Sequence, residues 1–357
     1  MSGTILIMAG GTGGHVFPGL AIADEMRDRG WKVVWMGARS GMEARLVPAR
    51  GYPVEWIRAA ALRGKGLAAK LLLPLHLLIG FWQSARAIFR VRPDVVLSMG
   101  GYVAFPGGMM ASLFARPLAV HEQNAIAGLT NRVLAGVAEK VMEAFPGALK
   151  GAEWTGNPVR AAIAAIPQPA ARYAGRNGPL RVLIVGGSLG AQALNEAVPK
   201  ALALIAEEMR PAVLHQAGEK HLESLRSNYS NANIKGELVA FIDDMARCYA
   251  EADLVICRAG AMTVAELSAG GMASVLVPFP HAVDDHQTVN ARFLSGKGAA
   301  ILLPQQELSP EKLSALLCSM DRKKLLEMAG KARALGKPEA ARIVADRCAA
   351  LLKGRAA

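Results

Sequence analysis

Two groups of residues in this 357-residue chain have types and spacings suited to chemistry on a polar ligand. In the first group, the apolar residues 254–257 lead into a turn of mostly small residues, and a helix carrying Glu266 is expected to follow. Such a turn lets a ligand reach the bare N–H groups of the helix, where the dipole favours a phosphate. Glu266 could accept hydrogen bonds from two sugar hydroxyls, which would indicate a nucleotide-sugar pocket, or could be an ordinary partner of the helix dipole.

The second group is the segment Gly10-Gly-Thr-Gly-Gly-His15, which follows an apolar strand and precedes a helix expected to begin near Pro18. A strand, a small-residue loop and a helix form a cradle for a phosphate or a sugar. The segment fits neither Gly-x-Gly-x-x-Gly nor Gly-Lys-Ser/Thr, so binding of NAD or ATP is disfavoured. His15 could act as a general base towards an incoming hydroxyl, or could bond its own loop.

Three further segments at the ends of expected strands suit a polar substrate. Residues 100–106 form a second glycine turn, and residues 122–131 carry amides and a carboxylate that suit carbohydrate hydroxyls. Residues 186–191 form a third glycine turn, in which Ser188 could bond a phosphate or cap a helix. Because loops at the carboxyl ends of parallel strands surround one crevice, the first two glycine turns are expected to face one substrate.

Apolar segments of strand length alternate with helical ones along the chain, a pattern that predicts parallel α/β sheets. Residues 5–29 and 180–209 share one layout of strand, glycine turn and helix. We therefore expect two Rossmann-like, doubly wound α/β domains with a cleft between them. The expected strands are residues 5–8, 33–37, 54–58, 94–99, 118–121 and 140–144 in the first domain, and 180–185, 211–217, 234–239, 254–257, 274–277 and 299–303 in the second.

The expected domains span residues 1–159 and 160–337. Residues 161–179 are rich in alanine and proline, which indicates a hinge. A final helix, within residues 338–357, is expected to pack back on the first domain.

Composition narrows the class of protein. The chain has 41 Lys and Arg against 29 Asp and Glu, a formal net charge of +12, which indicates an anionic partner such as a phosphorylated metabolite, a nucleic acid or an acidic membrane. The basic residues are spread along the chain without interleaved aromatics, so nucleic acid is disfavoured. Four scattered cysteines are expected to be reduced thiols, and neither a signal peptide nor a bilayer-spanning segment is expected.

A basic stretch followed by an apolar one covers residues 63–82. At 100° per residue, Leu75, Ile79 and Trp82 fall on one helical stripe, and Lys70 precedes them. A core-facing helix would explain the stripe. Apolar residues beside cations also suit docking on anionic lipid headgroups without insertion, and the net charge favours this interpretation.

Six ordered motifs extend over nearly the whole chain, at residues 10–21, 98–103, 121–124, 156–160, 186–191 and 258–266. Together they resemble a bacterial family, the UDP-N-acetylglucosamine–N-acetylmuramyl-(pentapeptide) pyrophosphoryl-undecaprenol N-acetylglucosaminyltransferases. These enzymes turn lipid I into lipid II in peptidoglycan synthesis, which serves cell-wall biogenesis, cell shape and cell division. The resemblance implies a GT-B fold and inverting transfer of GlcNAc from UDP-GlcNAc to the C4 hydroxyl of MurNAc in lipid I.

The resemblance also implies an acceptor site on the first domain, a donor site mainly on the second, no cofactor, and a peripheral position on the cytoplasmic face of the inner membrane. His15 is the implied base, with Glu122 as the second candidate. Arg160 and Ser188 would serve the diphosphate. The full set of implied UDP-GlcNAc residues is Thr12, Gly13, Gly14, Asn124, Arg160, Ser188, Ile242 at the uracil, Ala261, Met262, Thr263, Val264, Ala265, Glu266 at the ribose, and Gln287 with Asn290 at the GlcNAc.

The departing UDP gains negative charge, which something must stabilise. Metal-dependent transferases commonly use Asp-x-Asp, and this sequence contains none. Helix N-termini with Ser188 and Arg160 are therefore the expected stabilisers, and no metal is expected. Asp284-Asp-His286 could hold a metal but more simply caps a helix.

Three other functions stay open on the sequence alone. A related membrane-surface transferase could glycosylate a diacylglycerol, although it would have less reason for the His121-Glu-Gln-Asn segment. The chain could instead be a non-catalytic subunit that binds a nucleotide sugar or recruits a partner. A nucleic-acid binder is the third alternative.

Overall fold

A computed structural model of the chain describes residues 2–58, 73–187 and 190–353. It divides into two compact units. Unit 1 is Met1–Arg160 with Glu339–Ala357, and unit 2 is Ala161–Pro338. Arg160 therefore ends the first unit, one residue beyond the boundary drawn from the sequence.

Unit 1 is built on a parallel sheet in the order β3-β2-β1-β4-β5-β6-β7. The chain winds outward in one direction from β1 and in the other from β4, so the strand order reverses between these two neighbours. Ligands of open α/β sheets bind at such a switch point, beyond the carboxyl ends of the strands. The strands are β1 (Thr4–Met8), β2 (Lys32–Gly37), β3 (Val54–Trp56), β4 (Val95–Ser98), β5 (Leu118–Glu122), β6 (Lys140–Glu143) and β7 (Glu153–Trp154).

Helices cover both faces of this sheet because its strands are apolar on both faces. Ile5 and Ile7 of β1 lie in one core cluster, and Leu6 and Met8, which alternate with them, lie in another. The first cluster also holds buried side chains of α1 and α16, and the second those of α4, α5 and α6. The helices are α1 (Gly13–Asp28), α2 (Glu43–Ala49), α4 (Leu73–Val91), α5 (Ala104–Leu113), α6 (Leu129–Leu134) and α16 (Ala340–Lys353).

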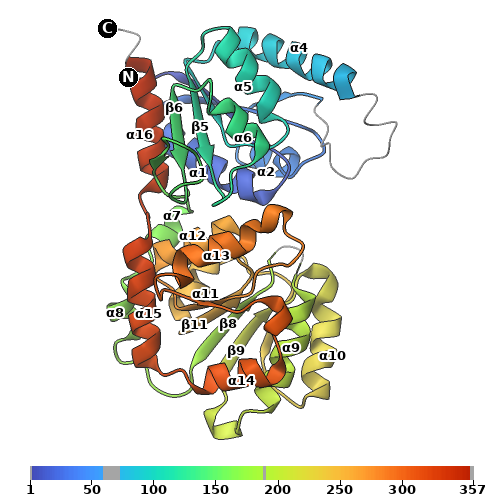
Figure 1. Ribbon diagram of the computed structural model, residues 1–357, viewed down its shortest axis with the longest axis vertical. Helices are drawn as coiled ribbons and strands as arrows, with labels where there is room; N and C mark the ends of the chain where they lie inside the picture. The colour runs from blue at the N-terminus through green and yellow to red at the C-terminus, as the bar shows by residue number, and fades with distance from the viewer. Residues whose placement is uncertain (1, 59–72, 188–189, 354–357) are drawn as a thin grey trace. The chain divides into compact units, whose positions relative to one another are not determined.

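The C-terminal helix α16 is part of unit 1 (Figure 1). Val344, Ala345 and Cys348 are fully buried in the core cluster that contains α1. Asp346 Oδ1 accepts a hydrogen bond of 2.7 Å from Arg29 Nη1, which ties the outer face of α16 to the end of α1.

Unit 2 repeats the design with a parallel sheet in the order β10-β9-β8-β11-β12-β13. Its switch point lies between β8 and β11, which pair directly. The strands are β8 (Arg181–Val185), β9 (Ala212–Gln216), β10 (Glu237–Val239), β11 (Leu254–Cys257), β12 (Ser274–Leu276) and β13 (Ile301–Leu302). The main helices are α9 (Gln192–Ala203), α10 (Leu222–Asn231), α11 (Met245–Glu251), α12 (Ala261–Gly270), α13 (His286–Ser295), α14 (Pro310–Cys318) and α15 (Arg322–Leu335).

The expectation of a hinge over residues 161–179 is wrong. This segment forms two short helices, α7 (Ala161–Ala164) and α8 (Pro169–Tyr173), which pack on α12 and α15. The buried guanidinium of Arg172 donates to the carbonyls of Pro167 at 3.0 Å and Gly270 at 3.1 Å. Alanine and proline here serve close packing within unit 2, not a flexible linker.

No helix in the described part of the chain is both long enough and apolar enough to cross a bilayer. All four cysteines lie among the described residues and are free thiols, as expected.

Acid should destabilise unit 2 through His215. This side chain is fully buried on β9 between Tyr229 and Asn195, and burial lowers its pKa to about 3. The unfolded chain takes up the proton near pH 6.5 and the folded one does not, so stability is lost as the pH falls below that value. We expect a loss of roughly 3 kcal/mol from this group between about pH 7 and pH 4.

The measurement is urea unfolding followed by circular dichroism at both pH values, in the wild type and in His215→Gln. The wild type should lose more stability on acidification than the variant does. Equal losses would show that His215 is not held neutral by burial.

Candidate active site

The two glycine loops of unit 1 lie against each other at the switch point. Gly100 and Gly101 follow β4 with φ of +91° and +83°, a region that favours glycine. A Cβ on Gly101 would lie 2.6 Å from the Gly10 carbonyl oxygen, and one on Gly100 would lie 3.4 Å from His15 Cε1. The loops after β1 and β4 therefore meet, and only residues without a side chain allow so close an approach.

A buried carboxylate, Glu43, holds the first glycine loop. Its Oε2 accepts from Gly11 N at 3.0 Å and its Oε1 accepts from Ala38 N at 3.0 Å. A Cβ on Gly10 would lie 2.5 Å from Oε1, so the loop closes directly on the carboxylate. The sequence analysis missed Glu43, because an acidic residue in the first turn of an expected helix has no distinguishing signal.

Helix α1 begins at Gly13, five residues before the expected start near Pro18. The N-cap residue Thr12 is extended, and its side chain makes no cap bond. Pro18 lies inside the helix. Because proline has no N–H, only the Gly14 carbonyl lacks its helical partner. His15 is consequently in the first helical turn and not in the loop.

The ring of His15 is held by another segment, not by its own loop. Nδ1 of His15 lies 2.7 Å from Oε1 of Gln123, which follows β5. The alternative that His15 bonds its own loop through its side chain is therefore wrong. Gln123 is fully buried and was missed as a separate residue, although it lies within the 121–124 motif.

Glu122 is buried and binds its own loop. Its Oε1 accepts from Asn124 N at 2.9 Å, and its Oε2 accepts from Gly128 N at 3.1 Å and Asn131 Nδ2 at 3.0 Å. Asn131 in turn accepts from Ser98 Oγ at 3.0 Å, which links this loop to the end of β4. Both carboxylate oxygens hold the loop that carries Gln123 and Asn124, and this geometry favours His15 over Glu122 as the base.

In unit 2, the glycine loop after β8 is held by Gln216 at the end of β9. Gln216 Oε1 accepts from Gly187 N and its Nε2 donates to Gly187 O, both at 3.1 Å. Gly190 has φ of +76°, and a Cβ there would overlap the Ala217 carbonyl oxygen. Ser188 lies outside the described residues. The loop leads into the start of α9, where the N-cap residue Ala191 makes no side-chain cap bond.

Helix α12 starts directly after β11 with the same type of uncapped first turn. Its N-cap residue Gly260 has no side chain to bond the first N–H groups. Glu266 is in the second turn, so a role as an N-terminal partner of the helix dipole is disfavoured. Its Oε2 lies 3.4 Å from the Tyr249 hydroxyl, and the side chain is mostly buried.

The polar residues of α13 hold the loops that surround the start of α12. Gln287 Oε1 accepts from Phe279 N at 2.9 Å, and the fully buried Asn290 donates from Nδ2 to Ala259 O at 3.3 Å. Arg258 donates to the carbonyls of Val277 and Pro278, at 3.1 and 3.2 Å. The loops after β11 and β12 are thereby joined.

The structure thus places the candidate residues in two groups, one at the carboxyl edge of each sheet. In unit 1 these are Thr12, Gly13, Gly14, His15, Glu122 and Asn124, with the exposed Arg160 at the end of the unit. In unit 2 they are Ile242 after β10, the α12 residues Ala261, Met262, Thr263, Val264, Ala265 and Glu266, and the α13 residues Gln287 and Asn290.

Comparisons with known proteins agree on one family. Residues 5–143 match the glycosyltransferase family 28 N-terminal domain and residues 181–344 match the glycosyltransferase family 28 C-terminal domain. The UDP-N-acetylglucosamine–N-acetylmuramyl-(pentapeptide) pyrophosphoryl-undecaprenol N-acetylglucosamine transferase of Aromatoleum aromaticum is 64% identical over 352 residues, 99% of each chain. The protein of the same name from Azoarcus sp. is 62% identical over 354 residues, again 99% of each chain.

The chain belongs to this transferase family. The crystal structure of Acinetobacter baumannii MurG is 42% identical in sequence and superposes with a TM-score of 0.86, over 98% of this chain and 99% of that one. The transferase therefore has the GT-B fold predicted from its motifs, with a parallel α/β sheet in each unit.

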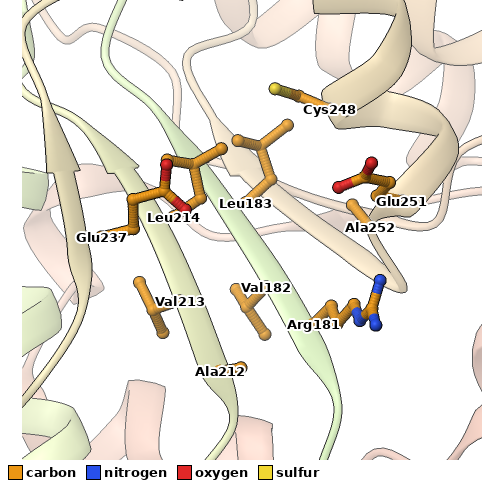
Figure 2. A pocket seen from close by; sticks show the side chains of 10 residues that line it. All are labelled: Arg181, Val182, Leu183, Ala212, Val213, Leu214, Glu237, Cys248, Glu251 and Ala252. Atoms are coloured by element: carbon orange, nitrogen blue, oxygen red, sulfur yellow. The ribbon is translucent and has the colours of Figure 1, made fainter.

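A hollow of about 240 Å³ lies elsewhere in unit 2 of the transferase (Figure 2). It is lined by the first residues of β8, β9 and β10 and by Cys248, Glu251 and Ala252 at α11. The glycine loop of residues 186–191 follows the opposite, carboxyl end of β8. The hollow is therefore separate from the candidate site.

Among residues 2–58, 73–187 and 190–353, no group of three or more His, Cys, Asp or Glu side chains could hold a metal ion. In the segment Asp284-Asp-His286, Asp285 Oδ1 accepts from Thr288 Oγ1 at 2.7 Å, at the start of α13. This bond is typical of a local turn.

If Glu122 holds its loop, Glu122→Gln should lower the stability of unit 1 by about 1–3 kcal/mol. The NH₂ group of the new amide would point at an N–H group that donates to the Glu122 carboxylate in the wild type. All five tryptophans lie in unit 1, so urea unfolding followed by tryptophan fluorescence reports on that unit. Glu143→Gln is the matched control. Glu143 lies beside Glu122 on the neighbouring strand β6, and its carboxylate likewise accepts from two backbone groups, Gly147 N and Leu149 N.

Both variants should be destabilised to a similar extent. A Glu122→Gln protein with wild-type stability and no turnover would instead identify Glu122 as the base.

Proposed function

We propose that this transferase moves GlcNAc from UDP-GlcNAc to the C4 hydroxyl of MurNAc in undecaprenyl-pyrophosphoryl-MurNAc-pentapeptide, lipid I, and so makes lipid II. The observation that carries the proposal is the 64% identity, over 99% of both chains, to a relative named for this reaction. The site geometry supports it, because each unit presents glycine loops and helix N-termini at the carboxyl edge of its sheet.

Catalysis on the acceptor side belongs to His15. Its Nδ1 is bonded to Gln123, which leaves Nε2 as the ring atom for a substrate. Nε2 takes the proton of the C4 hydroxyl as the hydroxyl oxygen attacks the anomeric carbon. Direct attack on an α-linked donor gives a β-linked, inverted product.

The donor is bound mainly by unit 2. The uracil lies against the backbone of Ile242, the ribose hydroxyls donate to Glu266, and Gln287 with Asn290 reads the GlcNAc. Tyr249 positions the Glu266 carboxylate, and the α13 amides support this role by fixing the loops at the start of α12. The family motifs also imply a donor role for Thr12, Gly13, Gly14 and Asn124 of unit 1.

Helix N-termini stabilise the charge that develops on the leaving UDP. Helices α9 and α12 both begin without a side-chain cap, so their first N–H groups are available to the diphosphate. Arg160 and Ser188 add to this stabilisation. The N–H groups are fixed before the reaction, so they stabilise the charge without reorganising.

The acceptor is reached at a membrane surface through α4. Leu75, Leu78, Trp82 and Phe89 are 54%, 66%, 62% and 61% exposed, and we name them the α4 patch. Successive members are three, four and seven residues apart, which places them on one face of the helix. The Arg86 guanidinium lies 5.9 Å from the centroid of the Trp82 ring system. Exposed apolar side chains beside cations suit docking on anionic headgroups at the cytoplasmic face of the inner membrane.

The sequence analysis also assigned Ile79 and Lys70 to this surface. Ile79 is half-buried at the margin of the patch, and Lys70 lies outside the described residues. A core-facing helix would bury the stripe, so the exposure of Leu75 and Trp82 favours docking.

Substitution at His15 and at Glu266 should affect different kinetic constants. His15→Ala should lower kcat by about 10²- to 10⁴-fold with little change in the KM for UDP-GlcNAc, because a base acts on the acceptor proton. Glu266→Ala should raise that KM by roughly 10- to 100-fold, because the loss of hydrogen bonds to a charged group weakens binding by about this factor. Steady-state kinetics with a soluble lipid I analogue measure both.

Calorimetric titration with UDP-GlcNAc is the control, and His15→Ala should bind the donor like the wild type. Donor binding without transfer in the wild-type protein would overturn the enzymatic proposal in favour of a nucleotide-sugar-binding subunit. Transfer to diacylglycerol but not to the lipid I analogue would favour the related lipid glycosyltransferase.

Replacing Leu75, Ile79 and Trp82 together by Ser should release the protein from vesicles that contain anionic lipid, because the apolar contact area is lost. Vesicle co-sedimentation measures the effect. Leu204→Ser with Met209→Ser is the matched control, since these side chains of unit 2 are also exposed, at 57% and 65%. Retained binding by a folded triple variant would contradict the docking role.

A further inference from the structure

A series of hydrogen bonds joins the ring of His15 to a backbone carbonyl through two buried side chains. Gln123 Oε1 lies 2.7 Å from His15 Nδ1, and Gln123 Nε2 lies 3.1 Å from His121 Nδ1. His121 Nε2 lies 2.9 Å from the carbonyl oxygen of Gly156. Gln123 and His121 are fully buried, so water does not compete for these bonds.

The carbonyl at one end sets the direction of every bond. A carbonyl oxygen only accepts, so His121 Nε2 must carry a proton and donate it to Gly156 O. Burial lowers the pKa of His121 to about 4, so the ring is neutral near pH 7 and its Nδ1 keeps a lone pair. The amide nitrogen of Gln123 donates to that lone pair.

A second carbonyl fixes the orientation of the Gln123 amide. Gln123 Nε2 also donates to the backbone oxygen of His121 at 2.7 Å. The flipped amide would place its oxygen against two acceptors, which excludes it. The amide oxygen of Gln123 therefore faces His15, and because that oxygen only accepts, His15 Nδ1 must be the donor.

We propose that Gln123 and His121 are positioning residues that hold neutral His15 in the tautomer with its proton on Nδ1, which leaves the Nε2 lone pair bare. A ring without this bond exchanges between two tautomers, and the one protonated at Nε2 cannot accept a proton there. The use of Nε2 as the base rests on the proposed function, whereas the tautomer itself does not.

The arrangement also suits the transfer step. The O–H bond of the acceptor breaks and its proton goes to His15 Nε2, while the hydroxyl oxygen bonds to the anomeric carbon. The bond between that carbon and the UDP oxygen breaks, and its electron pair leaves with UDP. His15 becomes an imidazolium that still donates Nδ1–H to Gln123, so no bond in the series has to reverse.

Nitrogen NMR of the full chain labelled with ¹⁵N-histidine tests the tautomer without any substrate. Spectra are recorded at about pH 9, above the ordinary pKa range of imidazole, and the shifts of the two ring nitrogens show which one is protonated. The His15 signals are assigned by their loss in His15→Gln. We expect a bare Nε2 in the wild type and a mixture of tautomers in Gln123→Met.

Kinetics with UDP-GlcNAc and a soluble lipid I analogue provide the second readout. Gln123→Met should lower kcat by about 10- to 100-fold, part of the contribution of a general base, with an unchanged KM for UDP-GlcNAc. Gln83→Met is the control, since Gln83 also accepts a backbone N–H through its Oε1, from Arg58, and it should keep the wild-type kcat.

A wild-type His15 protonated on Nε2, or a tautomer that does not change in Gln123→Met, would overturn the inference. If the tautomer behaves as expected but His15→Ala keeps its turnover, the positioning role stands and the base role under the proposed function fails.

Discussion

The site in unit 1 depends on one steric constraint, the close approach of two loops at the ends of adjacent parallel strands. The loops after β1 and β4 meet where the strand order reverses, and a single methyl group on Gly101 would overlap the Gly10 carbonyl. Because the loops are this close, His15 in the first turn of α1 lies beside Gly100 and within hydrogen-bond distance of Gln123. The orientation of the proposed base follows from this contact.

Buried side-chain acceptors keep the loops in these shapes. Glu43 binds the N–H groups of two loops, Glu122 binds the loop after β5, and Gln216 brackets Gly187 in unit 2. Each satisfies backbone donors that no strand or helix pairs. Glu43 and Glu122 near the candidate site thus act as loop anchors, and the proposed chemistry is assigned to His15 and to helix N-termini.

The sequence predicted most strands of the two sheets, because apolar runs such as residues 5–8 and 254–257 have strand length and end at small-residue turns. It missed β7, whose two residues Glu153 and Trp154 form no apolar run. It also predicted that the loops after β1 and β4 lie at the same edge of the sheet, which follows from parallel topology. It could not predict Glu43, Gln123 or Gln216 as loop anchors, because their partners lie 32, 108 and 29 residues away. The sequence also left open whether the apolar stripe of α4 faces the core or solvent. A stripe alone does not indicate whether another element covers it.

The central claim is that His15 Nε2 receives the acceptor proton. A crystal structure of the transferase with UDP and a muramyl acceptor analogue tests it most directly. The C4 hydroxyl should lie about 2.6–3.2 Å from His15 Nε2, with Gln123 still bonded to Nδ1. A hydroxyl bonded to Glu122, or one out of reach of the His15 ring, would contradict the account.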